Sequence, residues 1–225
     1  MLHVYIGLDK QFGQRAAHVC RASLLKHASV PVTVTMLDQD WLRRLGIYHR
    51  QFYMSDGQSY DTTDGRPFST QFSFTRFLVP LLQPDGWAIF CDGDFLWRKD
   101  IADMAMNDRY ALMCVKHDYQ PPEQTKMLGQ VQEVYPRKNW SSLMAFNVAR
   151  NTLTPFQINT SKGSWLHGMQ WLDDAQIGAI PETWNALDGV SDDPDPAVYH
   201  YTRGTPDMPG HEDAPFADEW RQYGA

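Results

Sequence analysis

Two aspartates separated by one glycine are the residues best placed to do chemistry in this chain. Asp92, Gly93 and Asp94 directly follow the apolar run at 87–91, which predicts a buried strand. In open α/β sheets, ligands bind at the carboxyl ends of the strands. Carboxylate oxygens suit Mg²⁺ or Mn²⁺, especially where phosphate oxygens complete the coordination shell. The triplet therefore predicts a site for a divalent cation and a diphosphate.

A tight turn is the alternative interpretation of the same triplet. Asp-Gly is among the strongest short signals for a hairpin turn, and Gly93 would also let the backbone bend or let a ligand approach it closely. Residues 95–97 lack the glycine and the oxygen ligands of an EF-hand loop, which excludes a calcium loop of that kind. The residue types alone leave the cation site and the turn both open.

The elements around the triplet predict a mixed α/β fold. A strand at 3–8, a helix at 14–27 and a strand at 30–37 have the spacing of a βαβ unit with a parallel sheet. Polar segments at 45–68 and 118–141 show no sustained period and are expected to be long loops. The other expected elements are a helix at 69–80, short helices at 101–106 and 165–172, and strands at 87–91, 110–115, 142–146 and 198–201.

Composition excludes several classes of protein. The 225 residues are 43% hydrophobic and carry a formal net charge of −7, which predicts a globular protein without a basic surface for nucleic acid. Three widely spaced cysteines predict neither a disulfide framework nor a cysteine-based metal site. The first residues lack the basic region of a signal peptide, and every apolar run is shorter than the roughly 20 residues of a membrane span. We therefore expect a cytoplasmic protein.

Short motifs spread over most of the chain carry a family resemblance. They are Tyr-Ile-Gly-Leu-Asp at 5–9, Phe-Thr-Arg-Phe at 74–77, Ile-Phe-Cys-Asp-Gly-Asp at 89–94 and His-Tyr-Thr-Arg-Gly at 200–204. In this order they resemble glycosyltransferase family 8. They are most similar to a bacterial branch of family-8-like proteins, which also contains stretches like 135–142 and 180–185. The order of the motifs is more specific than any one of them.

The resemblance implies a fold and an activity. The fold is an A-type glycosyltransferase fold, with a Rossmann-like, mostly parallel sheet flanked by helices in a single domain over 1–225. About 1–115 would bind the nucleotide sugar and about 116–225 the acceptor. The resemblance further implies Mn²⁺ or Mg²⁺ as the cofactor, a UDP-sugar as the donor, a glycan or lipid-linked acceptor, and transfer with retention of configuration.

Residue roles also follow from the resemblance. Asp92 and Asp94 would be the metal-binding pair and His200 the third protein ligand. The residues expected to bind the nucleotide sugar are Tyr5 and Asp9 near the uracil, Arg76 near the diphosphate or the metal-binding loop, and Gly93, Ser141, Ser142, Arg203 and Gly204. Asp174, as nucleophile or stabiliser, and its neighbour Gln176 would lie near the reacting carbon. The family's glycine-then-lysine ending after the histidine is missing from 204–208, and Arg203 is the candidate replacement for that cation.

Three of these residues also have structural explanations. A lone histidine such as His200 is often a hydrogen-bonded strand residue. Arg76 lies among apolar neighbours, where an unpaired cation is costly, so a partner among Asp92 and Asp94 is as good an explanation as a phosphate. The adjacent acids that include Asp174 are typical of an ordinary polar turn.

Other functions are compatible with the same residues. A nucleotidyltransferase also needs carboxylates and a metal, although no glycine-rich phosphate loop occurs near residues 7–15. A non-catalytic module that binds carbohydrate or nucleotide would explain the many aromatic residues, and a hydrolase would use water as the acceptor. For a transferase, acceptor recognition is expected in the loops at 45–68 and 118–139, with Tyr48, His49, Tyr53, Tyr60, His117 and Tyr119 as the candidate contacts.

Overall fold

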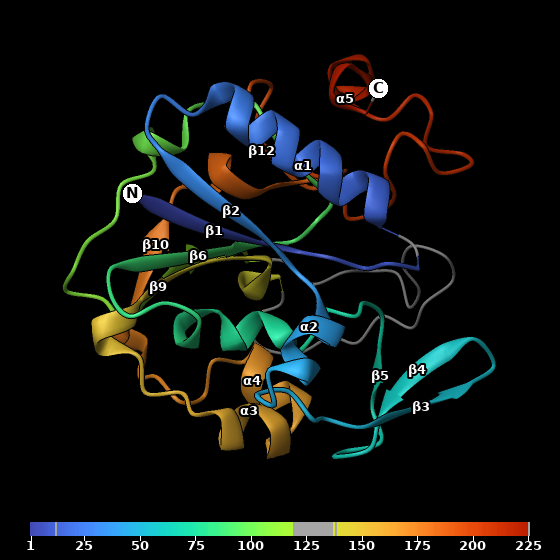
Figure 1. Ribbon diagram of the computed structural model, residues 1–225. Helices are drawn as coiled ribbons and strands as arrows, with labels where there is room; N and C mark the ends of the chain where they lie inside the picture. The colour runs from blue at the N-terminus through green and yellow to red at the C-terminus, as the bar shows by residue number, and fades with distance from the viewer. Residues whose placement is uncertain (12, 119–136, 138, 225) are drawn as a thin grey trace.

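A six-stranded sheet forms the centre of the computed structural model (Figure 1), which describes residues 1–11, 13–118, 137 and 139–224. The strand order is β10-β8-β9-β6-β1-β2. These strands are β1 (Leu2–Gly7), β2 (Val32–Leu37), β6 (Trp87–Cys91), β8 (Leu112–Val115), β9 (Leu143–Asn147) and β10 (Ile177–Ile180). The β1–β2, β1–β6 and β8–β10 pairs are parallel, and β9 is antiparallel to both of its neighbours. All strands except β9 therefore run in one direction, and their carboxyl ends share one edge.

Helix α1 (Gln14–His27) covers one face of this sheet. Its buried residues Ala17, Cys20 and Leu24 recur at helical spacing and pack with strand residues such as Val4 and Ile89. Because one face of the helix is apolar and its ends are polar, the period in the sequence predicted this element correctly.

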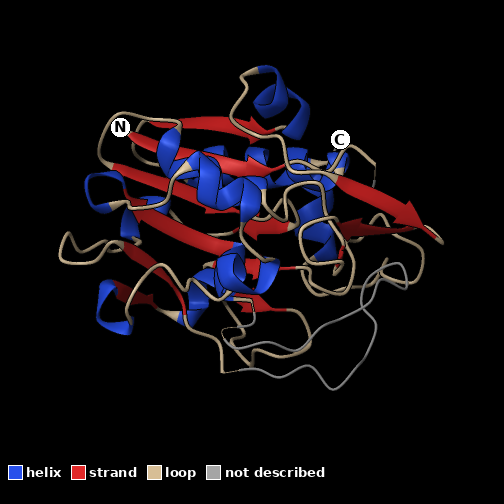
Figure 2. Ribbon diagram, turned by 90° about the horizontal axis from the view of Figure 1, so that it is seen from below, coloured by secondary structure: helices blue, strands red, loops and turns tan. Residues whose placement is uncertain are grey.

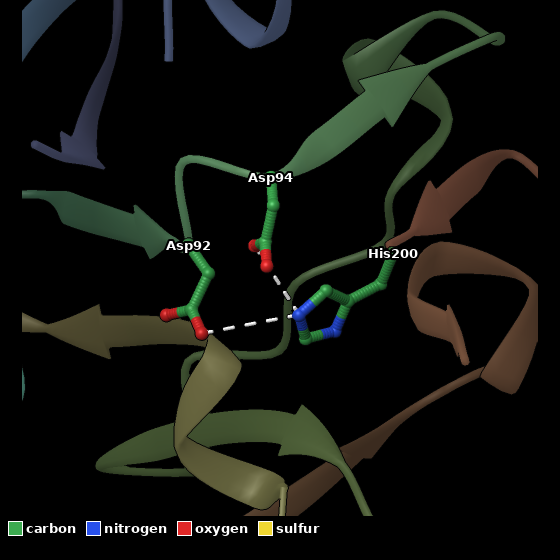
Figure 3. A group of neighbouring side chains, drawn as sticks. All are labelled: Asp92, Asp94 and His200. Atoms are coloured by element: carbon green, nitrogen blue, oxygen red, sulfur yellow. Dashed lines mark ion pairs between the residues drawn. The ribbon is translucent and has the colours of Figure 1, made fainter. Parts of the chain in front are cut away.

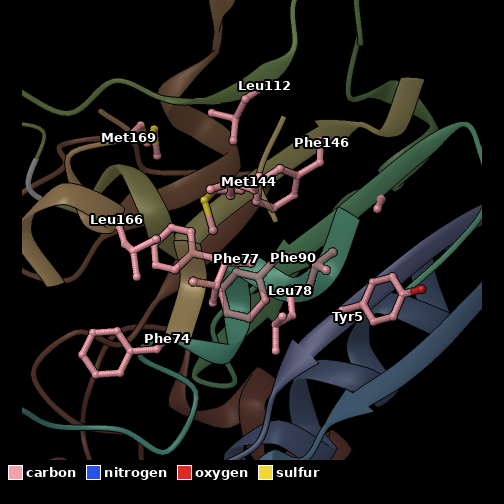
Figure 4. Packing of buried hydrophobic residues seen from close by; sticks show 14 of the residues in the cluster. Tyr5, Phe74, Phe77, Leu78, Phe90, Leu112, Met144, Phe146, Leu166 and Met169 are labelled. Carbon is pink, nitrogen blue, oxygen red and sulfur yellow. The ribbon is translucent and has the colours of Figure 1, made fainter. Parts of the chain in front are cut away.

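The opposite face is covered by a 3₁₀ helix, η1 (Thr75–Leu81), and by α3 (Pro155–Thr160) and α4 (Gly163–His167) (Figure 1). Figure 4 shows the hydrophobic core between these helices and the sheet, in which Phe77 and Phe90 lie close to Met144. A helix was expected over 69–80, but the helical segment is shorter and contains Pro80. Proline removes a backbone donor and favours a short, tight turn over a longer α-helix.

A second sheet joins segments from both halves of the chain. It has the order β11-β12-β7, with β7 (Phe95–Trp97), β11 (Ala186–Leu187) and β12 (Val198–His200). Since β6 and β7 belong to different sheets, the Asp-Gly-Asp segment between them is not a hairpin turn. Figure 2 marks all strands in red and the helices in blue. Helix α5 (Ala217–Tyr223) contacts α1, and Tyr223 Oη lies 3.2 Å from His27 Nε2.

The polar segment 45–68, expected to be a loop, contains a small antiparallel sheet instead. Its strands are β3 (Phe52–Ser55), β4 (Gln58–Asp61) and β5 (Pro67–Phe68), and Figure 1 shows the β3–β4 hairpin projecting from the body. Asp56 and Gly57 both have positive φ, as a two-residue hairpin turn requires. At the base of the hairpin, Arg50 and Asp61 form a buried ion pair of 2.6 Å.

Several other boundaries differ from the expected ones. The short helix expected at 165–172 is α4, the one expected at 101–106 is the turn η2 (Ile101–Asp103), and the strands expected at 110–115 and 142–146 are β8 and β9. The remaining helical elements of the described residues are α2 (Gln39–Arg44), η4 (Trp140–Ser142), η5 (Val148–Arg150), η6 (Asp174–Gln176) and η7 (Glu182–Asn185). Most of the expected loop at 118–141 lies outside the described residues. Among the helices that the structure describes, none combines the length and apolarity needed to cross a bilayer.

Candidate active site

Asp92, Asp94 and His200 converge at the carboxyl edge of the central sheet (Figure 3). His200 Nε2 lies 3.3 Å from Asp94 Oδ1 and 3.9 Å from Asp92 Oδ2. One ligand atom from each residue falls within 4.8 Å of the others. The histidine side chain is 5% exposed and the carboxylates are 15% and 18% exposed. The group is thus nearly enclosed, with access through the two aspartates.

Strand pairing brings His200 to the aspartates. In the second sheet, β12 runs antiparallel to β7, with His200 opposite Phe95. The Tyr201 N–H donates to the Asp94 carbonyl at 3.1 Å, and the Asp92 N–H donates to the Ser142 carbonyl at 2.9 Å. The backbone on both sides of the triplet is therefore fixed by hydrogen bonds, and the carboxylates have few ways to move apart.

Gly93 has a packing role in this turn. A Cβ at this position would collide with the carbonyl oxygen of Gly7 at the end of β1 and would lie 3.2 Å from the Cβ of Ala17. The sequence predicted that Gly93 permits a bend of the backbone and close approach of a ligand, and the approach of a ligand stays a prediction. The end of β1 and helix α1 occupy the side on which a Cβ would point, so glycine is needed because the Asp-Gly-Asp loop lies directly on them.

The donor atoms of the cluster fit a divalent cation. His200 Nδ1 is 2.9 Å from the Asn185 side-chain oxygen, which can only accept, so Nδ1 carries a proton. In that tautomer, a neutral imidazole directs the Nε2 lone pair at two carboxylates. In the neutral ring this contact is unfavourable, and either a divalent cation between the groups or a proton on Nε2 would relieve it. Asp94 Oδ1 is also buried and receives no hydrogen bond from the described residues. Two oxygen donors and one nitrogen donor match Mn²⁺ or Mg²⁺.

Arg76 pairs with the first aspartate. Its Nη1 lies 3.0 Å from Asp92 Oδ1 and donates to the Ser141 carbonyl at 2.8 Å. The guanidinium also lies over the ring of Phe90, 4.9 Å from its centroid. Of the two explanations left open for Arg76, the structure shows the pairing with an aspartate, and a contact with the diphosphate stays a prediction. This buried cation offsets part of the negative charge of the cluster.

The two serines before β9 hold the site together through hydrogen bonds within the protein. Ser141 Oγ lies 2.9 Å from Nδ1 of His167, the last residue of α4. Ser142 Oγ donates to the Asn139 carbonyl at 2.7 Å and accepts from the Asn185 amide at 2.8 Å. Both serines lie beside the cluster. Their expected role as partners of the donor sugar stays a prediction.

Tyr5 and Asp9 lie on and just after the neighbouring strand β1. Tyr5 is opposite Phe90 in the sheet and is 5% exposed, and burial raises its pKa. Asp9 is also buried, and its carboxylate accepts from the Gln71 N–H at 3.1 Å. Asp9 thus joins the carboxyl end of β1 to the segment before η1. Their predicted proximity to a uracil remains a prediction.

Asp174 and Gln176 do not lie with the cluster, contrary to the expectation. They precede β10. The strand pairing from β10 through β8 and β9 to β6 places Ile177, the first residue of β10, level with Ala88 of β6. Ala88 precedes Asp92 by four residues, which is about 13 Å along a strand. Because β10 and β6 run in the same direction, the start of β10 lies at the amino edge of the sheet. The order of residues along the chain suggested proximity, but strand direction separates them.

Arg203 and Gly204 lie beyond β12. Arg203 is exposed, and its guanidinium packs over Gly189, where a Cβ would collide with it. Gly204 is buried with φ of 153°, and a Cβ there would meet the ring of His211. No contact between Arg203 and the cluster is seen among the described residues. Its role as a substitute cation for phosphate stays a prediction.

The residues expected to recognise the acceptor have different surroundings. Tyr48 is 4% exposed and lies under the guanidinium of Arg43, so it packs in the core and is not a surface for sugar stacking. Tyr53 and Tyr60 stack on each other on the β3–β4 hairpin, with ring centroids 5.3 Å apart. The His49 N–H donates to the Asn159 side chain, and Tyr119 lies outside the described residues.

Among the acceptor candidates that the structure describes, His117 lies near His200 of the cluster. It follows β8 at the carboxyl edge, and its carbonyl accepts from the Trp140 indole at 2.9 Å. Its Nε2 is buried and has no hydrogen-bond partner among the described residues. Burial, and to a lesser extent the nearby His200, lower the pKa of His117 to about 4. Its imidazole is therefore neutral at pH 7.

Two contributors to this site were not singled out in the sequence. Asn185 contacts His200, and His167 contacts Ser141. Asn185 ends one of the stretches used for the family resemblance, so its presence was noted without a role. His167 follows an apolar helical piece and carries no pattern that points to the site. Both contacts join segments far apart in the sequence.

Solved glycosyltransferases are similar to this chain in fold. The glycosyltransferase GlyE of Streptococcus pneumoniae TIGR4 superposes with a TM-score of 0.59 at 16% identity, over 99% of this chain and 60% of GlyE. The galactosyltransferase LgtC, solved with donor and acceptor sugar analogues, gives 0.54 at 15% identity, over 99% of this chain and 95% of LgtC. This chain thus spans about 60% of the length of GlyE. With its mostly parallel central sheet, it has the A-type glycosyltransferase fold.

A relative with much higher identity defines the family. The chain is 44% identical over 229 residues to Protein CDI of Arabidopsis thaliana, and the match covers 96% of this chain and 83% of the relative. The chain therefore belongs to the family of Protein CDI. No protein-family model matches it.

Proposed function

We propose that this protein is a metal-dependent glycosyltransferase of the family 8 type. It would transfer a sugar from a UDP-sugar to a hydroxyl of a glycan or lipid-linked acceptor, with retention of configuration. The observation that carries the proposal is the convergence of Asp92, Asp94 and His200 at the carboxyl edge of an A-type glycosyltransferase sheet. Open α/β sheets bind their ligands at this edge.

The charge of the cluster supports this activity. Two carboxylates and the Arg76 guanidinium give a formal charge of −1, which a divalent cation would convert to +1. Asp92, Asp94 and His200 would hold Mn²⁺ or Mg²⁺, and such a cation stabilises the charge of a departing diphosphate as a Lewis acid. Arg76 keeps Asp92 oriented, and the local positive charge would attract an anionic donor to an otherwise acidic protein.

The residues around the site bear on the route by which a retaining transfer would proceed. Retaining transfer needs either an enzymic nucleophile or a same-face route. Because Asp174 lies at the amino edge, we assign it no part in the reaction and propose the same-face route. His117 offers a buried nitrogen close to His200, which we assign to a hydroxyl of the bound sugar or acceptor.

Donor binding and turnover test the proposal. Thermal unfolding with UDP, several UDP-sugars and other nucleotide sugars, each with and without Mn²⁺, should show the largest stabilisation for a UDP-sugar with Mn²⁺. UDP release from that donor should require Mn²⁺ and disappear in Asp94→Ala. Asp174→Ala is the matched control, and we expect it to keep the wild-type rate.

Product analysis separates this function from the others. A glycosylated acceptor identifies a transferase, and free sugar without it identifies a hydrolase. Nucleotide transfer to a sugar phosphate would identify a nucleotidyltransferase. Glycan binding that needs no metal, together with no turnover of any donor, would contradict the proposal in favour of a binding module.

A further inference from the structure

Behind His200, three polar groups form a chain of hydrogen bonds whose directions are fixed. The chain begins at the carbonyl of Asn139, which can only accept. Ser142 Oγ lies 2.7 Å from that carbonyl, so the hydroxyl proton is used there. A serine hydroxyl has one proton. Toward its other neighbour, Ser142 Oγ can therefore act only as an acceptor.

That neighbour is the side chain of Asn185. Its amide nitrogen lies 2.8 Å from Ser142 Oγ, and a nitrogen donor is the group that an accepting hydroxyl needs. If the amide were flipped, its oxygen would face an oxygen with no proton to share. The amide oxygen of Asn185 is thus directed at His200 Nδ1, 2.9 Å away, and this nitrogen must donate.

Burial makes this arrangement costly to change. Asn185 is 0% exposed and Ser142 is 3% exposed, so water does not replace a lost partner easily. Rotating the amide would leave buried polar groups unpaired, which costs more than an ordinary hydrogen bond contributes. Ser142 also accepts from the Asp92 N–H through its carbonyl. One residue therefore supports two members of the metal cluster.

We propose that Asn185, oriented by Ser142, is a positioning residue that keeps the His200 proton on Nδ1 and so keeps Nε2 open as a ligand for the divalent cation. This inference rests on the proposed metal site and adds the source of its affinity. Outer partners of this kind fix the tautomer and ring orientation of a metal-binding histidine, and their loss typically weakens metal binding by about 10- to 100-fold.

Manganese affinity measured without any substrate tests the inference. Free Mn²⁺ can be followed by electron paramagnetic resonance during titration of the wild type, Asn185→Leu, Asn185→Asp, Ser142→Ala and Ser142→Thr. Asn185→Leu removes the acceptor and should weaken binding by about 10- to 100-fold. Asn185→Asp keeps an acceptor for Nδ1–H and should bind more tightly than Asn185→Leu. Ser142→Thr keeps the hydroxyl and should bind more tightly than Ser142→Ala.

The tautomer itself gives a second measurement, which needs no metal. Nitrogen-15 NMR of the metal-free protein, with His200 assigned by comparison with His200→Gln, should show the proton of the neutral ring on Nδ1. Asn185→Leu should shift the ring toward the other tautomer. A purely structural role for Asn185 would change stability in both variants at this position and would leave Asn185→Asp as weak in Mn²⁺ binding as Asn185→Leu.

Two failures can be told apart. If the wild type does not bind Mn²⁺, the metal site of the proposed function is wrong, and this inference is overturned with it. If the wild type binds Mn²⁺ and Asn185→Leu, shown to be folded by circular dichroism, binds it equally well, only the inference is overturned. A neutral His200 ring with its proton on Nε2 in the metal-free wild type would also overturn it.

Discussion

Two acidic pairs lie at opposite edges of the central sheet and have different surroundings. At the carboxyl edge, Asp92 and Asp94 are mostly buried and face His200. At the amino edge, Asp173 and Asp174 belong to the turn that starts β10, and the side chain of Asp174 is 87% exposed. Both pairs follow apolar segments in the sequence, so local composition does not distinguish them.

The surroundings decide what each pair can do. Asp173 forms a reciprocal capping box with Gln176, which satisfies backbone donors at the start of η6. Asp174 pairs with Arg137 near the surface. At the other edge, Arg76 is buried against Asp92, and the second sheet brings His200 to Asp94. Chemistry requires converging, poorly solvated ligands, and only the pair at the carboxyl edge has them within the described part of the chain.

The largest difference between the edges should appear in stability. Arg76→Met leaves a mostly buried carboxylate of Asp92 without its cation, and we expect the free energy of unfolding to fall by about 3–5 kcal/mol. Urea denaturation measures this change. The exposed pair at the amino edge provides the control, since Asp174→Ala should stay within about 1 kcal/mol of the wild type. Equal losses in both variants would contradict the comparison.

The second largest effect is expected on activity, from a substitution at the carboxyl edge. Asp94→Asn removes a charged ligand while it keeps the shape of the side chain. We expect UDP-sugar turnover to fall by about 100- to 1,000-fold, the cost typical of losing one group that stabilises developing charge. Initial rates at saturating Mn²⁺ measure this loss. A wild-type rate in Asp94→Asn would remove the carboxyl edge from the reaction.

Packing under the Asp-Gly-Asp loop gives a smaller effect. Gly93→Ala places a methyl group against the Gly7 carbonyl, and such overpacking typically costs about 1–3 kcal/mol. Gly13→Ala is the matched control, because a Cβ there has only ordinary contacts, the nearest at 3.5 Å from Asp9 Cβ. Thermal unfolding of the two variants compares them. Equal stability would mean that the loop moves freely away from β1.

The pH dependence of stability tests the surroundings of His117 near the carboxyl edge. Its pKa is lowered to about 4 in the folded protein, whereas an unfolded histidine titrates near 6.5. Between these values the unfolded chain binds the extra proton, so stability is lost as the pH falls from about 6.5 to 4. His117→Phe should lose less stability over this range than the wild type. We expect a difference of at least about 2 °C in the change of the unfolding midpoint, and identical pH profiles would contradict a buried, neutral His117.

Local patterns in the sequence were sufficient for part of this protein. The helix at 14–27 and the strand before Asp92 have clear apolar periods and polar ends, so both were predicted close to their observed bounds. The ligand types and their order along the chain indicated a metal site. In contrast, the hairpin that contains Asp56 and Gly57 was missed, because each of its two strands is only four residues long and β3 is exposed throughout.

Tertiary structure decided which of the candidates meet. His200 reaches Asp94 through the register of β12 on β7, and Asn185 reaches His200 through a side-chain hydrogen bond between separate segments. Asp174 was placed near the reaction by its order in the chain and lies instead at the far edge, because β10 runs parallel to β6. Residue type sets what a side chain is able to bind. Strand direction and register set which side chains share a site, and neither is fixed by the period of any single segment.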